Sequence, residues 1–292
     1  MLYSVPNNFE RIFMQEQPVN LPQAQPNGSP VKTFAATVLH RRATIHFKSD
    51  TVPEEYLNAI LRLGAQAPSG YNLQPWRFIV VREDANRSRL QVAAFKQPKI
   101  IEAPVVIIAF GMKEEWKRRA EEVFQEGARR GAGNPATVQQ YKNSALGFLL
   151  HMPMNVWVNR HTMIAVTTMM LAAESYGLDT APMEGFDAQA IKSEFAIPDE
   201  AEVVALLAIG YAQEPDKVYP GRFALNEIVY SEKFGTPWIE ADASANLNNA
   251  DSELTSIDEM PESEIPGARI INHPGQASEA AQPSEPDQSG TV

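Results

Sequence analysis

Short apolar runs rich in β-branched residues divide the middle of the chain. Two of these runs, Phe78–Val81 and Val105–Phe110, predict buried strands. A third strand is predicted over Val203–Tyr211. Together these runs predict a sheet in the body of the protein.

Apolar positions at helical spacing predict the helices. The first helix begins near Pro53, since apolar residues then recur at near-helical intervals: Tyr56, Leu57, Ile60, Leu61 and Leu63. An exposed helix is predicted over residues 113–130, with Trp116 and Phe124 on one side.

The longest helix is predicted over Trp157–Tyr176. Gly177 follows it at the C′ position, where a left-handed residue ends a helix and glycine is favoured. Another helix is predicted over residues 187–195, with Asp187 as its N-cap. Because helices and strands do not alternate strictly, the order predicts an α+β fold.

The two ends of the chain differ from this body. Residues 1–33 are rich in proline, asparagine and glutamine and predict an extended or loosely docked arm. Residues 241–292 have few bulky apolar side chains, so we predict a disordered tail there. The body then spans residues 34–240.

Charge sits mainly in the tail. The chain carries −11 overall, and residues 240–292 hold eleven acidic residues against Arg269 alone, a net charge of −10. The rest of the chain carries −1, so no basic excess suggests a nucleic-acid partner. The acidity of the tail indicates nothing about the charge of a substrate.

Several classes of protein do not suit this sequence. It has no cysteine, which removes disulfides, thiolate nucleophiles and cysteine-based metal sites. The five histidines have no metal-ligand spacing, so no metal site is expected. The richest apolar run, Met163–Ala173, is too short for a membrane span, and the first residues lack a secretion signal. We expect a cytoplasmic protein.

Three segments carry candidate chemistry. In the first, His40–Phe47, the adjacent Arg41 and Arg42 could grip a phosphate, because guanidinium groups match phosphate oxygens. They could equally form a solvated charge pair.

The second segment is Ala67–Trp76. Pro68, Gly70 and Pro75 shape a loop, on which Ser69, Asn72 and Gln74 offer polar groups to a heteroaromatic edge or a sugar-like chain. The alternative is a local turn closed by a buried Trp76.

The third segment is Gly177–Asp187. Pro182 and Gly185 predict a tight turn whose backbone N–H groups could face a ligand. Glu184 suits solvent, so any role of this turn is expected to lie in its main chain.

Together the segments resemble the nitroreductase family over Thr37–Trp238. The shared motifs are Arg-Arg-x-x-x-x-Phe, Pro-Ser-x-x-Asn-x-Gln-Pro-Trp and Pro-Met-Glu-Gly-Phe-Asp, followed by Tyr219-Pro-Gly-Arg222. Four motifs in the family's order are specific to the family but do not name a substrate. The resemblance implies the nitroreductase-like fold, a mostly antiparallel sheet flanked by helices, in an intertwined homodimer.

The resemblance also implies an FMN site. Arg41 and Arg222 would clamp the phosphate with Arg42 and Ala43 beside them, and the loop with Pro68, Ser69, Gly70, Asn72 and Gln74 would contact the ribityl chain and pyrimidine. Pro182 and Met183 would lie against the ring, and the backbone of Glu184 and Gly185 would bond near N5. A cation near N1 would come from Lys96 or Lys99, with Gln97 as a neutral alternative.

The chain departs from the family pattern in two of the motifs. Many members carry serine and then a basic residue where this chain has Ala43 and Ile45, and lysine where it has Pro220. Two expected cations are therefore missing, and Lys217 is a candidate replacement. We expect weaker FMN affinity or a less stabilised reduced flavin.

The family mechanism would move hydride from NADH or NADPH to the flavin and then to a nitroaromatic or quinone by a ping-pong cycle. Catalysis would need no dedicated acid or base in the protein, and no Gly-x-Gly-x-x-Gly fingerprint follows a strand. Other flavin chemistry, such as reductive dehalogenation or flavin breakdown, and a non-catalytic flavin-binding protein remain alternatives.

Acceptor specificity is expected from residues 112–156. Its aromatic residues could line the pocket or belong to the core: Trp116, Phe124, Tyr141, Phe148 and, just beyond, Trp157. The stretch Phe223–Trp238 resembles the family's extension onto the partner subunit, and Asn226–Tyr230 predicts an added strand.

Overall fold

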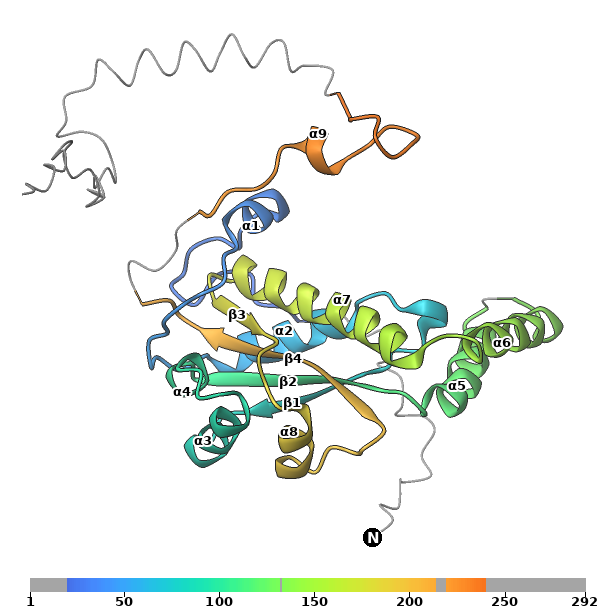
Figure 1. Cartoon of the computed structure of the whole chain (residues 1–292), viewed down its shortest axis with the longest axis horizontal. Coiled ribbons are helices and arrows are strands. Elements are labelled where there is room, and N and C mark those ends of the chain that lie inside the picture. The colour runs from blue at the N-terminus through green and yellow to red at the C-terminus, as the bar shows by residue number, and fades with distance from the viewer. Residues whose placement is uncertain (1–19, 132, 214–218, 240–292) are drawn as a thin grey trace, which may run out of the picture. The chain divides into compact units, whose positions relative to one another are not determined.

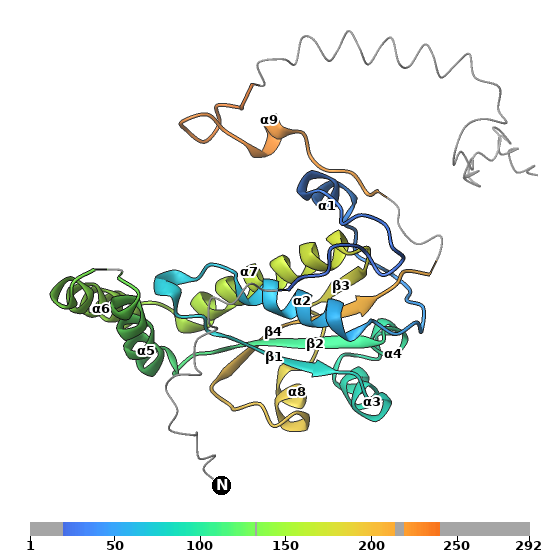
Figure 2. The same cartoon turned by 180° about the vertical axis from the view of Figure 1, so that it is seen from behind.

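The computed structural model describes residues 20–131, 133–213 and 219–239. The predicted tail over residues 241–292 and most of the predicted arm lie outside the described residues. The chain divides into two compact units between Pro220 and Gly221. The first unit holds a sheet with helices on both faces (Figures 1 and 2).

The sheet has four strands: β1 (Trp76–Val81), β2 (Val105–Met112), β3 (Asp179–Met183) and β4 (Ala201–Gly210). Their order is β1-β2-β4-β3, and every neighbouring pair is antiparallel. This confirms the α+β prediction and the three predicted strands; three of their six ends lie two residues further out than predicted, and β4 ends one residue earlier.

The prediction of a tight turn at Pro182 is wrong, because Pro182 lies within β3, opposite Leu207 of β4. Proline cannot donate a ladder hydrogen bond and is tolerated in an edge strand. β3 pairs with β4 on one side only and forms an edge of the sheet. The chain turns after Met183, at Glu184 and Gly185.

The two faces of the sheet are covered by different helices (Figure 2). Helices α2 (Glu54–Ala65) and α7 (Met154–Ser175) pack on the face that carries Val105, Ile107 and Ala109 of β2. Helices α3 (Asp84–Ala93) and α8 (Ala188–Glu194) pack on the face that carries Val106, Ile108 and Phe110. Side chains alternate between faces along a strand, so β2 is apolar throughout because both of its faces are buried.

The residues predicted to begin or end helices do so in the structure. Pro53 is the N-cap of α2, and Asp187 caps α8 by accepting from the N–H groups of Gln189 and Ala190. Gly177 has φ of 73° directly after α7, as a left-handed C′ residue should. These helix ends could be predicted from the sequence because each depends on residues that are close together in the chain.

The segment between β2 and α7 forms two helices, α5 (Trp116–Arg129) and α6 (Pro135–Leu149). They project from one end of the sheet (Figure 1). A separate apolar cluster joins them to α7 and to the loop before β1: Leu73, Trp116, Ala120, Val123, Leu149, Trp157 and Val158. This cluster fixes the position of that loop.

Helix α1 (Phe34–His40) precedes Arg41, and α4 (Lys99–Glu102) precedes β2. Neither helix was predicted. Ahead of α1, the described part of the arm is docked: the Tyr56 hydroxyl donates to the Ala24 carbonyl, and Lys32 pairs with buried Glu174. Among the described residues, no helix combines the length and apolarity needed to cross a membrane.

Candidate functional site

One group of predicted site residues gathers along β3. Ala43 forms a parallel bridge with Thr180 of β3, and the Thr44 N–H donates to the Thr180 carbonyl at 3.0 Å. The backbone of the first motif therefore continues the edge of the sheet. We call Arg41, Ala43, Gln97 and residues 182–185 the edge cluster.

The two arginines of the first motif differ in their contacts. Arg42 lies over the Tyr219 ring at 4.5 Å and donates to the carbonyls of Leu39 and Arg41. Arg41 is half-buried, and within the described part of the chain its guanidinium has no hydrogen-bond or ion-pair partner. Arg41 is therefore the better of the two to bind an anion.

The turn after β3 is held by Gln97. Its Nε2 donates to the Gly185 carbonyl at 2.7 Å, and the Asp187 N–H donates to the Ala93 carbonyl at 2.8 Å. Lys96 is exposed with φ of 60°. The neutral alternative Gln97 thus makes the contact with this turn, while Glu184 and Gly185 are exposed.

A second group lies on the loop before β1. The Ser69 hydroxyl accepts from the Gln74 N–H at 2.9 Å, and Gln74 Nε2 donates to the Asn72 carbonyl and side chain at 3.1 and 3.2 Å. Asn72 and Gln74 have positive φ values of 55° and 45°, which are uncommon outside glycine. We call residues 69–74 the loop cluster.

Packing holds the loop cluster in this conformation. Leu73 is 1% exposed within the cluster of α5, α6 and α7. A Cβ on Gly70 would meet Trp157 Nε1 and His161 Nε2 of α7 at 3.3 Å, so a larger residue there would require these rings to shift. The Ser69 hydroxyl accepts a hydrogen bond within the loop and can still donate its own hydrogen, so its predicted contact with a ligand stays a prediction.

Arg77, which no sequence motif singled out, ties the loop to α5. Its guanidinium donates to the carbonyls of Trp76 (2.6 Å) and Gln74 (3.3 Å) and pairs with Glu115. Burial, and then the nearby Arg119, lower the pKa of Arg77. Its place at the start of a predicted strand gave no signal of this role.

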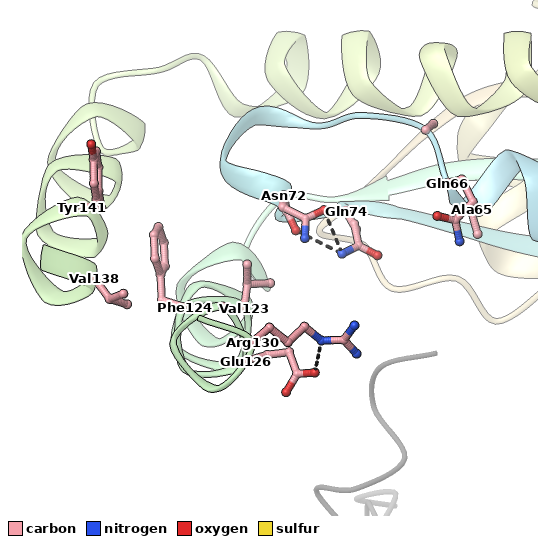
Figure 3. Close-up of a pocket in the computed structure, with 12 residues that line it drawn as sticks. Ala65, Gln66, Asn72, Gln74, Val123, Phe124, Glu126, Arg130, Val138 and Tyr141 are labelled. Carbon is pink, nitrogen blue, oxygen red and sulfur yellow. Dashed lines mark hydrogen bonds and ion pairs between the residues drawn. The ribbon is translucent and has the colours of Figure 1, made fainter. Parts of the chain in front are cut away.

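A cavity of about 480 Å³ opens beside the loop cluster. Figure 3 shows Asn72 and Gln74 facing α5, with Tyr141 of α6 beyond Phe124. The aromatic residues therefore divide: Phe124 and Tyr141 line the cavity, whereas Trp116 and Trp157 are buried in the core. Phe148 is exposed and lies against Tyr71 with ring centroids 6.2 Å apart.

The two clusters lie at opposite edges of the sheet, and the Ala43 end of the edge cluster is diagonally opposite the loop cluster. Thr180, beside Ala43, is in register with Ile209 and Val105, whereas Trp76, which follows the loop, is in register with Gly111. Six residues along β2 correspond to about 20 Å and three strand spacings to about 14 Å. The diagonal from Thr180 to Trp76 is about 25 Å, whereas Met183, in register with Leu206 and Ile108, lies about 17 Å from Trp76.

The remaining phosphate candidate, Arg222, belongs to the second unit, so its predicted role stays a prediction. Lys217 lies outside the described residues. In the second unit Leu225–Ile228 form the short helix α9, so the strand predicted over Asn226–Tyr230 is wrong there. Tyr230 instead bridges Pro237.

An antiparallel sheet covered on both faces, with a ligand-sized cavity at one corner, places the chain in the α+β class of globular proteins with a small-molecule pocket. The model of the nitroreductase family matches residues 38–211. The chain belongs to the nitroreductase family.

Individual relatives agree. The chain is 34% identical to an NADH dehydrogenase of Thermus thermophilus, over 68% of this chain and 96% of that protein. It is 30% identical to MhqN of Bacillus subtilis, named as an NAD(P)H nitroreductase, over 67% of this chain and 97% of that protein. At the level of the family, these matches confirm the prediction of an FMN-dependent NAD(P)H oxidoreductase.

Solved structures share the fold. The crystal structure of the Bacillus subtilis nitroreductase YdfN has a TM-score of 0.64 at 28% identity, covering 68% of this chain and 98% of that one. A nitroreductase of Exiguobacterium sibiricum, solved in complex with FMN, has a TM-score of 0.63 at 24% identity, covering 69% and 98%. The predicted nitroreductase-like fold is confirmed.

Proposed function

We propose that this chain reduces nitroaromatics, quinones or similar electron-poor acceptors with NADH or NADPH by a ping-pong cycle, using FMN bound between two copies of the chain. The observation that carries this proposal is the division of the site residues between the two edges of the sheet, where Ala43, beside Thr180, lies about 25 Å from Trp76 at the end of the other loop. One flavin nucleotide is too short to reach from the segment with Arg41 and Ala43 to the loop before β1 of the same chain. Each complete site combines the edge cluster of one copy with the loop cluster of the other.

The donors in the two clusters suit FMN. Arg41 offers a guanidinium to the phosphate, and Asn72 and Gln74 offer carboxamides to the polar edge of the ring or the ribityl chain. Gln97 fixes the turn at Gly185, where exposed backbone can face the ring. Arg42 supports the segment through its contacts with Leu39 and Tyr219.

FMN, when bound, supplies the hydride chemistry, and the protein positions it and the two substrates in turn. A quinone takes up two electrons and two protons to give a hydroquinone. A nitro group takes up the same to give a nitroso group and water. NAD(P)H supplies the hydride and solvent the second proton, so the protein needs no dedicated acid or base.

Exposed apolar side chains support the pairing of two copies. On α1, Phe34 and Leu39 are 76% and 67% exposed, which is unusual for a surface that stays in water. In the second unit, Phe223 and Phe234 are also exposed. We propose that α1 and residues 223–238 bury these side chains against a second copy.

The visible absorption spectrum tests both the presence of the flavin cofactor and its reduction by the enzyme. The purified protein should show a flavin band that NADH or NADPH bleaches without oxygen, and nitroaromatics or quinones should restore it. A flavin band that neither nicotinamide bleaches would contradict the enzyme. Restoration by halogenated phenols alone would favour a dehalogenase. Arg222→Ala should lower flavin occupancy, and unchanged occupancy would remove Arg222 from the site.

Subunit mixing tests the shared site. Arg41→Ala damages the edge cluster and Asn72→Ala the loop cluster, so each variant alone should lose activity at limiting FMN. In a mixed dimer one site carries both changes and the other carries neither. Co-refolded variants should therefore regain about a quarter of wild-type activity, since half the dimers are mixed and one site in each is intact.

The matched control mixes Arg41→Ala with Arg41→Glu. Both changes fall in the edge cluster, so no intact site can form and no activity should return. Native mass spectrometry verifies that mixed dimers are present. Mixed dimers of the first pair without recovered activity would refute a site built from two chains, and a monomeric active protein would refute the dimer.

A further inference from the structure

The cavity beside the loop cluster is also lined by the C-terminal end of α2. Figure 3 shows Gln66 at this end, on the other side of Asn72 and Gln74 from α5. Gln66 is exposed and is the C-cap of α2, where its backbone N–H donates to carbonyls of the last helical turn. The cap uses the main chain alone, so the Gln66 side chain is left to face the cavity.

Most other polar side chains of the cavity are already engaged. The two carboxamides of the loop cluster bond to each other at 3.2 Å and face the flavin in the proposed site. Glu126 accepts from Arg130 Nε at 2.5 Å. Among the described residues that line the cavity, the polar side chains without a hydrogen-bond or ion-pair partner are Gln66 and Tyr141. Of these two, Gln66 alone offers both N–H donors and a carbonyl acceptor.

The end of α2 is held by packing on both sides of Gln66. Gly64 lies against Met169 of α7. Ala67 is 6% exposed and packs with Trp76. The main chain at Gln66 is therefore fixed by its neighbours. A polar group on a rigid element orients a ligand more accurately than one on a mobile loop.

The rest of the lining suits a flat ring. Val123, Phe124 and Val138 are apolar, and a volume of about 480 Å³ admits a nicotinamide ring with its substituents. In such a pocket a small number of polar groups fix the orientation of the ligand. The proposed acceptors differ in their substituents, but both nicotinamide donors carry the same carboxamide on the ring. This carboxamide matches the Gln66 side chain group for group.

We propose that Gln66 binds the ring carboxamide of the nicotinamide and so orients NADH or NADPH in the cavity. This inference rests on the proposed function for the identity of the ligand as an electron donor. The Gln66 carbonyl accepts from the nicotinamide N–H, and the Gln66 N–H donates to the nicotinamide carbonyl. Because water satisfies the exposed Gln66 before a ligand binds, the net gain from each bond is modest, and its main effect is selectivity between donors.

The test compares NADH with reduced 3-acetylpyridine adenine dinucleotide, in which a methyl group replaces the amide nitrogen. On the FMN-loaded full-length protein, anaerobic stopped-flow absorption measures the second-order rate constant of flavin reduction by each donor. Gln66→Leu should lower the NADH-to-analogue ratio of these constants about two- to tenfold, as expected for one lost hydrogen bond. The different redox potentials of the two donors act equally on both proteins and cancel in this comparison.

Gln125→Leu is the matched control, because it makes the same change on α5 outside the cavity. That control should leave the ratio unchanged. An unchanged ratio in Gln66→Leu would overturn the inference. If Gln66→Leu changed only the preference of the reduced protein for 4-nitrobenzamide over 4-nitroacetophenone, Gln66 would serve the acceptor, and the inference would again be overturned.

Binding of free nicotinamide gives a readout that needs no electron transfer. Ligand-observed NMR on the oxidised, FMN-loaded protein should show tighter binding of nicotinamide than of 3-acetylpyridine to wild type, and similar binding of the two to Gln66→Leu. Equal or undetectable binding of both compounds to wild type would overturn the inference. A protein that selects nicotinamide through Gln66, but whose flavin neither NADH nor NADPH reduces, would refute the proposed function alone.

Discussion

The edge cluster and the loop cluster are held in place by different forces. Hydrogen bonds to the main chain hold the edge cluster: Ala43 bridges Thr180, and the Gln97 side chain donates to the Gly185 carbonyl. The loop cluster depends on a buried side chain, Leu73, and on residues with positive φ. A strand edge therefore presents ligand contacts through backbone, whereas a loop needs its own small core to do so.

The largest effect should come from Leu73→Ala, which tests the packing of the loop cluster. Removing a fully buried leucine side chain should lower the free energy of unfolding by about 2–5 kcal/mol. Urea unfolding measures this change. Val92→Ala is the control, because Val92 is 70% exposed on α3 and its loss should cost under about 0.5 kcal/mol. Equal losses would show that the loop needs no core.

Arg41→Ala probes ligand binding at the edge cluster with little effect on its structure. Loss of a charge-assisted bond to phosphate, worth about 1.5–3 kcal/mol, should raise the dissociation constant of FMN about ten- to a hundredfold. Flavin fluorescence on titration measures it. Arg82→Ala, which breaks an exposed pair with Glu54, should leave FMN affinity unchanged. If both variants weakened FMN binding equally, the effect would come from the net charge of the protein and not from a contact made by Arg41.

Gln97→Ala should have a smaller effect, on the turn that follows β3. The lost hydrogen bond to the Gly185 carbonyl should lower stability by about 0.5–1.5 kcal/mol and kcat several-fold, because the turn loses its fixed orientation. Thermal unfolding and steady-state kinetics measure both. Gln125→Ala on exposed α5 is the control and should change neither. If Gln97→Ala kept the wild-type kcat, β3 alone would position the turn and the Gln97 hydrogen bond would not be needed for it.

The smallest effect concerns acid stability beside the loop cluster. The pKa of Glu126 is lowered from 4.5 to about 2. Ionised Glu126 therefore stabilises the fold above about pH 4.5, and this contribution is lost as the pH falls toward about 2. Glu126→Gln should reduce the loss of stability across this window, measured as the urea midpoint against pH. Identical pH profiles would show that Glu126 contributes no stability there.

The sequence alone determined what depends on neighbours in the chain. The apolar runs predicted β1, β2 and β4, and Gly177 and Asp187 marked the end of α7 and the start of α8. The motifs predicted the family, because they combine residue types with fixed local spacing. They also named the residues of both clusters.

Tertiary structure decided the rest. Pro182 lies in a strand because β3 is an edge, and Gln97 rather than Lys96 contacts the turn because α3 ends opposite Gly185. The separation of the two clusters follows from strand order and register, which join residues far apart in sequence. Pairing energies along a sheet act between distant segments, so local pattern could name these residues but could not place them.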